Sequence, residues 1–182
     1  YARLYDGTYQ DTIDEWLDNA KTKWLHKGTG LLKSMLIGAS RYKSERPLRG
    51  SYVALNCAYL ALVDEAFALE QHEKMKAIMS KEVTIMGKQV FGIKEYMKKS
   101  PKLAFAGGDA GLVIYGLSAG GTAFALGSST YFGDWEFRSK LLRTAEMAGG
   151  TKKSKGKRCY RLGELFITGE ATALAMRTNI RR

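Results

Sequence analysis

The sequence predicts a mainly α protein, built as a helical bundle around a long buried central helix and carrying one or two small β-hairpins. Three observations predict this class. The chain has 182 residues, enough for one domain with a hydrophobic core. Residues 12–27 repeat apolar side chains at helical spacing, and residues 51–79 begin with a run that is apolar on nearly every face. We expect residues 1–148 to form a helical core domain and residues 149–182 to form a basic C-terminal segment, either an arm or a hairpin extension.

The clearest predicted helix spans residues 12–27. Thr12 and Glu15 have the spacing of a capping box, in which each side chain satisfies a backbone N–H of the other residue. Gly28 is suited to end this helix, and a second, shorter helix is expected over residues 31–40. One apolar stripe lies along the first helix and contains Ile13, Trp16, Leu17, Ala20 and Trp24.

The central helix is expected to run from Ser51 to about Met79. Its first half contains the run YVALNCAYLALV and should be buried, whereas its second half, EQHEKMKAIMSKE, is amphipathic and should emerge into solvent. We expect the side chains of Leu55, Tyr59 and Leu62 to face the core, with Cys57 as a small buried apolar residue.

The remaining elements are shorter. β-branched residues around Gly87-Lys88 predict a small hairpin over residues 83–92, followed by a short helix over residues 93–99. Asp134 is suited to cap a helix that continues to Ala148. A second strand pair is expected over residues 158–168, turning at Gly163-Glu164.

Positive charge is concentrated near the C-terminus. The whole chain carries a net charge of +11, and residues 149–182 hold nine Lys or Arg against two acidic residues. A basic excess of this size predicts a polyanionic partner, because cations that neutralise phosphates release condensed counterions. The simpler alternative is that each basic run is only a solvated surface.

Three basic clusters are the candidate nucleic-acid-binding residues. Tyrosines lie beside or within them, and an aromatic ring next to cations suits contact with bases. The first cluster comprises Lys152, Lys153, Lys155, Lys157, Arg158, Tyr160 and Arg161; the second comprises Arg41, Lys43, Arg46 and Arg49; the third comprises Lys98, Lys99 and Lys102.

The sequence therefore predicts a non-enzymatic protein that binds DNA or RNA and assembles on it as a homo-oligomer, like a viral or mobile-element nucleoprotein or coat. We expect no catalytic residue, no cofactor and no metal, since His26, His72 and the two cysteines show no metal-ligand spacing. Residues 110–127 lack a charge but are rich in Gly, Ser and Thr, so we expect a packed element there, not a membrane span. No signal peptide is visible, and the sequence leaves the location open, with a virion, the cytoplasm and a nucleoid as the alternatives.

The run Gly116-Leu117-Ser118-Ala119-Gly120 resembles the nucleophile elbow of α/β-hydrolases, in which a tight strand-to-helix turn exposes a serine hydroxyl. This resemblance implies that Ser118 is a nucleophile, and a serine hydrolase is accordingly one alternative function. However, that family places its histidine after the serine, and no histidine follows His72. The competing interpretation is that Gly108, Gly111, Gly116 and Gly120 permit close packing against the central helix.

Two short stretches resemble small helical bundles of the HEPN superfamily: residues 17–21 in the first helix, and Tyr52-Val53 with Ala58-Tyr59 in the central helix. The resemblance implies a helical bundle associated with nucleotides or RNA. Catalytic members carry an Arg followed by a His within about seven residues, and neither His26 nor His72 follows that pattern. The resemblance thus implies a non-catalytic domain, and a scaffold that binds a protein partner is the other alternative function.

Overall fold

A computed structural model describes residues 9–34, 47–98, 102–106, 111–149, 151–154, 156–160 and 175–178. Its helices are α1 (Gln10–Thr22), α2 (Gly50–Leu60), α3 (Glu65–Met79), α4 (Ala119–Tyr131) and α5 (Trp135–Gly149), with a short helical turn near Met176. Its strands are β1 (Ser80–Ile85), β2 (Lys88–Lys94), β3 (Leu103–Phe105), β4 (Leu112–Ile114), β5 (Leu117–Ser118), β6 (Thr151–Ser154) and β7 (Lys157–Tyr160).

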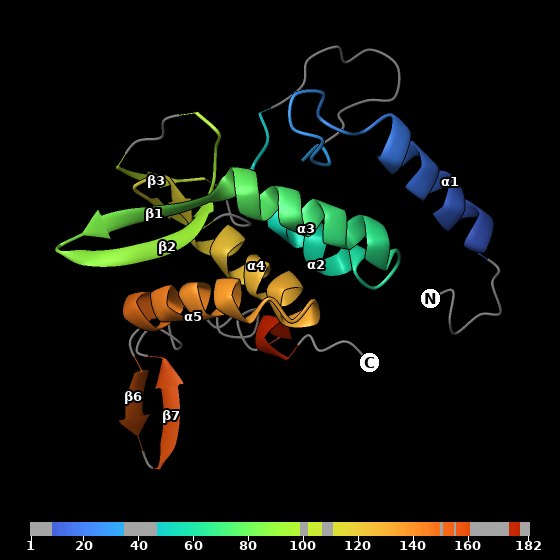
Figure 1. Ribbon diagram of the computed structural model, residues 1–182. Helices are drawn as coiled ribbons and strands as arrows, with labels where there is room; N and C mark the ends of the chain where they lie inside the picture. Colours follow the sequence, from blue (N-terminus) through green and yellow to red (C-terminus); the bar gives the residue numbers. More distant parts are fainter. Residues whose placement is uncertain are drawn as a thin grey trace.

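The prediction of a mainly α bundle is wrong, because β1 to β5 form one antiparallel sheet in the order β1-β2-β5-β4-β3. The sheet lies at one end of the layer of helices, and α1 lies at the other end (Figure 1). Strands β3, β4 and β5 are only two or three residues long. Such strands are too short for a period-two pattern, so periodicity could not reveal them.

The β1–β2 hairpin was predicted and is confirmed, although its strands extend further than residues 83–92. Met86 and Gly87 form its turn, both with positive φ, as a tight hairpin turn requires. The short helix expected over residues 93–99 is absent from its described part, residues 93–98. Ile93 and Lys94 complete β2 there, and Tyr96 forms a bridge with Arg49.

The predicted central helix is two helices. α2 ends at Leu60, and Asp64 starts α3 by accepting a hydrogen bond from the Phe67 N–H at 3.0 Å. Asp64 also forms an ion pair of 2.6 Å with Lys21 of α1. The residues between the two helices, 61–63, are as apolar as the end of α2, so the sequence shows no sign of the break.

The predicted core face of α2 is also wrong. Tyr59 is 57% exposed and Leu62 is 52% exposed, while Leu55 is half-buried. The buried face consists mainly of small residues, because α2 packs closely on α4. A Cβ added at Gly121 of α4 would lie 3.1 Å from the Ser51 backbone nitrogen of α2. The buried α2 residues include Val53, Ala54, Cys57 and Ala58, of which Cys57 was predicted.

The first helix begins at Gln10 and ends at Thr22, earlier than predicted, and Thr12 and Glu15 lie within it rather than at its start. Ala20 is buried against a second apolar cluster that contains Leu60 and Phe67. Residues 31–34 are not helical, and the rest of the predicted second helix lies outside the described residues. Helix α5 was predicted correctly, and Asp134 accepts a hydrogen bond from the Phe137 N–H at 3.2 Å.

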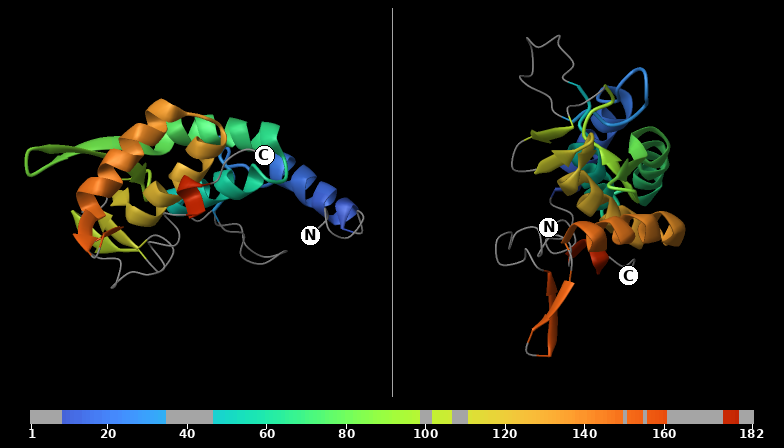
Figure 2. Two further views of the ribbon diagram at one scale, coloured as in Figure 1. Left: turned by 90° about the horizontal axis from the view of Figure 1, so that it is seen from below. Right: turned by 90° about the vertical axis from the view of Figure 1, so that its left-hand side faces the viewer.

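The structure describes a C-terminal strand pair, β6 and β7, which pair antiparallel over residues 151–154 and 157–160. The predicted pair over residues 158–168 is a different one, and its part from residue 161 on, including the turn at Gly163-Glu164, lies outside the described residues. The pair extends away from the helices and the five-stranded sheet in Figure 1 and in the right view of Figure 2. Met176, later in the chain, is buried in the main apolar core with Leu126 and Leu141.

Candidate functional site

The β6–β7 pair forms a basic two-stranded ribbon. Its register pairs Thr151 with Tyr160, Lys152 with Cys159, Lys153 with Arg158, and Ser154 with Lys157. Four predicted basic residues therefore lie on eight strand positions, and no acidic residue occurs between residues 151 and 160. Lys153 is exposed, while Lys155 and Arg161 lie outside the described residues.

The second predicted cluster is described only at Arg49, because Arg41, Lys43 and Arg46 lie outside the described residues. The Arg49 Nε lies 2.6 Å from the Glu95 Oε1, and its guanidinium also donates to the Ala106 carbonyl and stacks over Tyr52. The Glu95 side chain is fully buried and accepts hydrogen bonds from the hydroxyl and N–H of Ser51. The Arg49–Glu95 ion pair thus connects the start of α2 to the residue that follows β2.

Of the third cluster, Lys98 and Lys102 are exposed and Lys99 lies outside the described residues. The bridge between Arg49 and Tyr96 brings the second and third sequence regions together. The β6–β7 ribbon points away from this region (Figure 2, right). The described predicted residues consequently form two separate basic regions.

The strand–turn–helix context of the predicted elbow is present, but Ser118 is fully buried. Its hydroxyl accepts a hydrogen bond from the Gly121 N–H at 3.0 Å and caps α4. Tyr115 and Gly116 have positive φ and form the turn before it, and Gly121 makes the close approach to α2. Ser118 therefore has a structural role at the start of α4.

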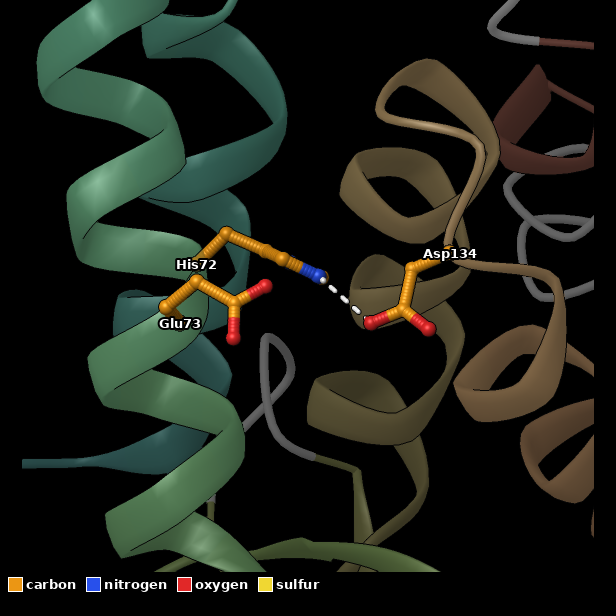
Figure 3. Close-up of side chains that lie close together, drawn as sticks. All are labelled: His72, Glu73 and Asp134. Atoms are coloured by element: carbon orange, nitrogen blue, oxygen red, sulfur yellow. Dashed lines mark hydrogen bonds and ion pairs between the residues drawn. The ribbon is translucent and has the colours of Figure 1, made fainter.

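A titratable cluster that the sequence did not predict lies where α3 meets the start of α5. The His72 Nε2 lies 3.4 Å from the Asp134 Oδ2, and the Lys76 Nζ lies 2.6 Å from the same oxygen. Glu73 lies 3.2 Å from the Lys76 Nζ. Figure 3 shows the His72 ring and the Asp134 carboxylate facing each other, with Glu73 beside His72. On the far side of the ring, the His72 Nδ1 lies 3.0 Å from the Ser128 Oγ of α4.

For both His72 and Asp134, burial shifts the pKa in one direction and the neighbouring groups shift it in the other. Burial lowers the pKa of His72, although Asp134 and Glu73 partly offset this effect. Partial burial raises the pKa of Asp134, but hydrogen bonds from Lys76, the Phe137 N–H and His72 outweigh it and lower the pKa overall. At neutral pH, the cluster therefore contains a neutral imidazole beside a carboxylate that is paired with an ammonium group.

Ser128, His72 and Asp134 follow the order hydroxyl, imidazole, carboxylate that a serine hydrolase uses. Ser128 and His72 are fully buried, so a substrate cannot reach the hydroxyl in this conformation. The potential metal-ligand atoms of His72, Glu73 and Asp134 lie within 4.8 Å of one another. A divalent cation would have to displace the Lys76 ammonium, which already binds both carboxylates. The contacts therefore support a network that connects α3, α4 and α5.

Sequence reasoning missed this network because His72 and Asp134 are 62 positions apart. Only the capping role of Asp134 had a local pattern. The buried Glu95 likewise occurs in a basic stretch without any sign of its pairing with Arg49.

No protein-family model and no curated protein matches the sequence of this chain. Within the described residues, no helix is long and apolar enough to cross a membrane. Residues 111–127, from the uncharged stretch, are divided among β4, β5 and the first part of α4.

Proposed function

We propose that the protein binds nucleic acid through the β6–β7 ribbon and catalyses no reaction on it. One observation carries this proposal. The ribbon extends from the body of the protein, and residues 151–160 contain Lys152, Lys153, Lys155, Lys157 and Arg158 without any acidic residue (Figure 1).

A two-stranded ribbon has dimensions that suit this role. The major groove of B-form DNA is about 12 Å wide and admits a two-stranded β-ribbon, whereas the major groove of A-form RNA is too narrow for side chains to read. Several closely spaced cations can then contact successive phosphates. Assembly of several copies on the nucleic acid, as a nucleoprotein or coat, is part of the same proposal.

The test is to replace Lys152, Lys153, Lys155, Lys157 and Arg158 together with Gln. We expect weaker binding to every sequence, because phosphate contacts carry no base information. The slope of log affinity against log salt should fall by roughly 0.7–0.9 per lost contact, or by up to about 3.5–4.5 units if all five residues contact phosphates. Fluorescence anisotropy with duplex DNA, duplex RNA and single strands at several salt concentrations measures this slope.

A matched control removes the same charge elsewhere. Lys23, Lys27, Lys81, Lys88 and Lys140 are exposed on the body and can be replaced with Gln together. We expect the slope of log affinity against log salt for this variant to stay close to that of the parent. Equal losses in the two five-residue variants would show that overall charge, rather than the ribbon, attracts nucleic acid and would overturn the proposal.

Tyr160 in β7 provides a second, chemically different test. Stacking of a base on an aromatic ring is largely independent of salt, so Tyr160→Ala should lower affinity by about 1–3 kcal/mol while leaving the slope unchanged. The same anisotropy titrations with single strands measure both quantities. An unchanged affinity would limit the interface to phosphate contacts.

A further inference from the structure

Two groups of exposed apolar side chains lie at opposite ends of the protein. The first group lies where the turn between α2 and α3 meets α1, and the second lies on β3 and β4. Figure 1 shows α1 at one end of the layer of helices and the five-stranded sheet at the other. The layer of helices separates the two groups, so they cannot cover each other within one copy.

The first group, here named the turn surface, comprises Tyr59, Leu62, Val63 and Trp16. The three residues at the end of α2 are 52–57% exposed, and Trp16 of α1 is 42% exposed. Trp16 lies one helical turn before Ala20, which packs in the apolar cluster that contains Leu60 and Phe67. Apolar side chains that gather at one place on a surface are typical of a contact site, whereas single ones are not.

The second group, here named the sheet surface, comprises Leu103, Leu112 and Ile114. Leu103 pairs with Ile114 across β3 and β4, and Leu112 lies two positions from Ile114, so all three side chains share one face. Val113 points to the opposite face and is fully buried, whereas Leu103 is 65% exposed and Leu112 is 44% exposed. The sheet surface therefore points away from the core.

The two ends carry opposite charge. Helix α1 contains no basic residue over positions 10–20 and four acidic residues, Asp11, Asp14, Glu15 and Asp18. At the other end, Lys102 directly precedes β3, Lys98 lies four positions earlier, and both are exposed. Among described residues 94–98, 102–106 and 111–118 the acidic residue is Glu95, which is buried and paired with Arg49.

This distribution of charge favours contact between unlike ends of two copies. The whole chain carries a net charge of +11, so copies repel one another in most orientations. Two sheet surfaces, or two turn surfaces, would bring like charges together, whereas a turn surface against a sheet surface places acidic α1 beside lysines. A contact between unlike surfaces leaves one surface of each kind free, so further copies can add to the row.

We propose that copies of this chain associate head to tail, with the turn surface of one copy against the sheet surface of the next. Apolar side chains form the centre of this contact and charged side chains form its rim. In Figure 1 the β6–β7 ribbon extends from α5 to one side of the line between the two ends, so each copy keeps its ribbon exposed. The inference rests on the proposed function, whose assembly it describes, but it is tested without nucleic acid and with the ribbon unchanged. Failure of the contact and failure of ribbon binding are therefore separate results.

Sedimentation velocity of the nuclease-treated full chain measures this association. We expect the parent to form assemblies larger than a dimer, which grow with protein concentration. Leu62→Asp on the turn surface and Leu103→Asp on the sheet surface should each remain monomeric. An equal mixture of these two variants should form a dimer and nothing larger, because each retains the surface that the other has lost. A parent that stays monomeric up to about 1 mM, or a mixture that does not associate, would overturn the proposal.

A matched control makes the same kind of change outside both surfaces. Met86 is 97% exposed in the turn of the β1–β2 hairpin, and Met86→Asp should associate like the parent. Circular dichroism verifies that each variant is folded. If Met86→Asp also remains monomeric, added charge rather than the loss of a particular surface prevents association, and the proposal is wrong.

Charge reversal tests which ends meet. Asp14→Lys with Glu15→Lys should weaken association by about tenfold, and Lys98→Glu with Lys102→Glu should do the same. A chain that carries all four changes should associate again nearly as strongly as the parent, because opposite charges then meet once more. Additive weakening in the four-fold variant would contradict the contact between α1 and the lysines beside the sheet surface.

Discussion

Glu95 places a fully buried carboxylate 2.6 Å from the Nε of Arg49, across the junction between the sheet and α2. The same junction is tightly packed, because a Cβ added at Gly50 would lie 1.9 Å from the Lys94 carbonyl oxygen. Arg49 was predicted to contact nucleic acid. Its intramolecular ion pair gives it a structural role that its sequence context did not indicate.

Replacing Arg49 with Ala should destabilise the fold by about 3–5 kcal/mol, because a buried carboxylate then loses its counter-ion. Arg49→Met combined with Glu95→Leu should recover much of this loss, since no charge remains buried. Urea unfolding measures the free energy in each case. Lys140→Ala, which removes an exposed pair with Glu136, should leave stability unchanged. A loss below about 1 kcal/mol in Arg49→Ala would show that Glu95 does not depend on Arg49.

His72 should make the fold less stable as pH falls. Its folded-state pKa is lowered by burial, so below about pH 6.5 the unfolded chain binds a proton that the folded chain does not. The free energy of unfolding should therefore decrease on acidification, by at most about 1.4 kcal/mol per pH unit for this single group. Unfolding of the parent and of His72→Gln between pH 7.5 and pH 5 measures the difference.

The groups around His72 define the control for that experiment. Asp134, Glu73 and Lys76 contact or adjoin the ring, and the lowered pKa of Asp134 contributes to pH dependence only at pH values near and below about 4. His26→Gln, which alters the histidine that contacts Thr29, is the comparison variant. If His72→Gln keeps the pH dependence of the parent, the assignment to His72 is contradicted.

Leu141 and Leu62 should differ strongly when each is shortened to Ala. Leu141 is fully buried in the main core, so its truncation should cost about 2–5 kcal/mol. Leu62 is 52% exposed in the turn between α2 and α3, and its truncation should change stability by no more than about 0.5 kcal/mol. Thermal and urea unfolding of the two variants measure these costs. If the two variants lose similar amounts of stability, Leu62 makes apolar contacts that the described residues do not include.

Ser118→Ala should affect folding rather than chemistry. Losing the hydroxyl that caps α4 should cost about 0.5–2 kcal/mol. We expect neither the parent nor the variant to hydrolyse p-nitrophenyl acetate above the rate of the buffer. Hydrolysis that disappears in Ser118→Ala would contradict the structural role and support a serine hydrolase.

Local patterns predicted several elements. The stripe containing Leu17 and Ala20 predicted α1, Asp134 predicted the start of α5, and the residues around Gly87 predicted the β1–β2 hairpin. In each case, residues within a few positions of one another carry the relevant pattern. The boundaries of α1 were less well predicted, because Tyr9 rather than Thr12 precedes its first turn.

Other features depend on residues far apart in the chain. The break at Asp64 is stabilised partly by Lys21, and the exposed side of α2 follows from where α4 packs. His72 meets Asp134, and Arg49 meets Glu95, only after the helices and the sheet come together. The number of positions between two such residues in the sequence does not indicate how far apart they lie in the folded chain.

The amino-acid sequence was sufficient to predict the basic character of residues 149–182, the amphipathic helices and the hairpin at Gly87, because composition and short-range periodicity specify them. The five-stranded sheet, the burial of Ser118 and the environment of His72 depended on tertiary packing. Very short strands gain their hydrogen-bond partners only within a sheet, and a buried polar group acquires its role from neighbours that the folded chain supplies.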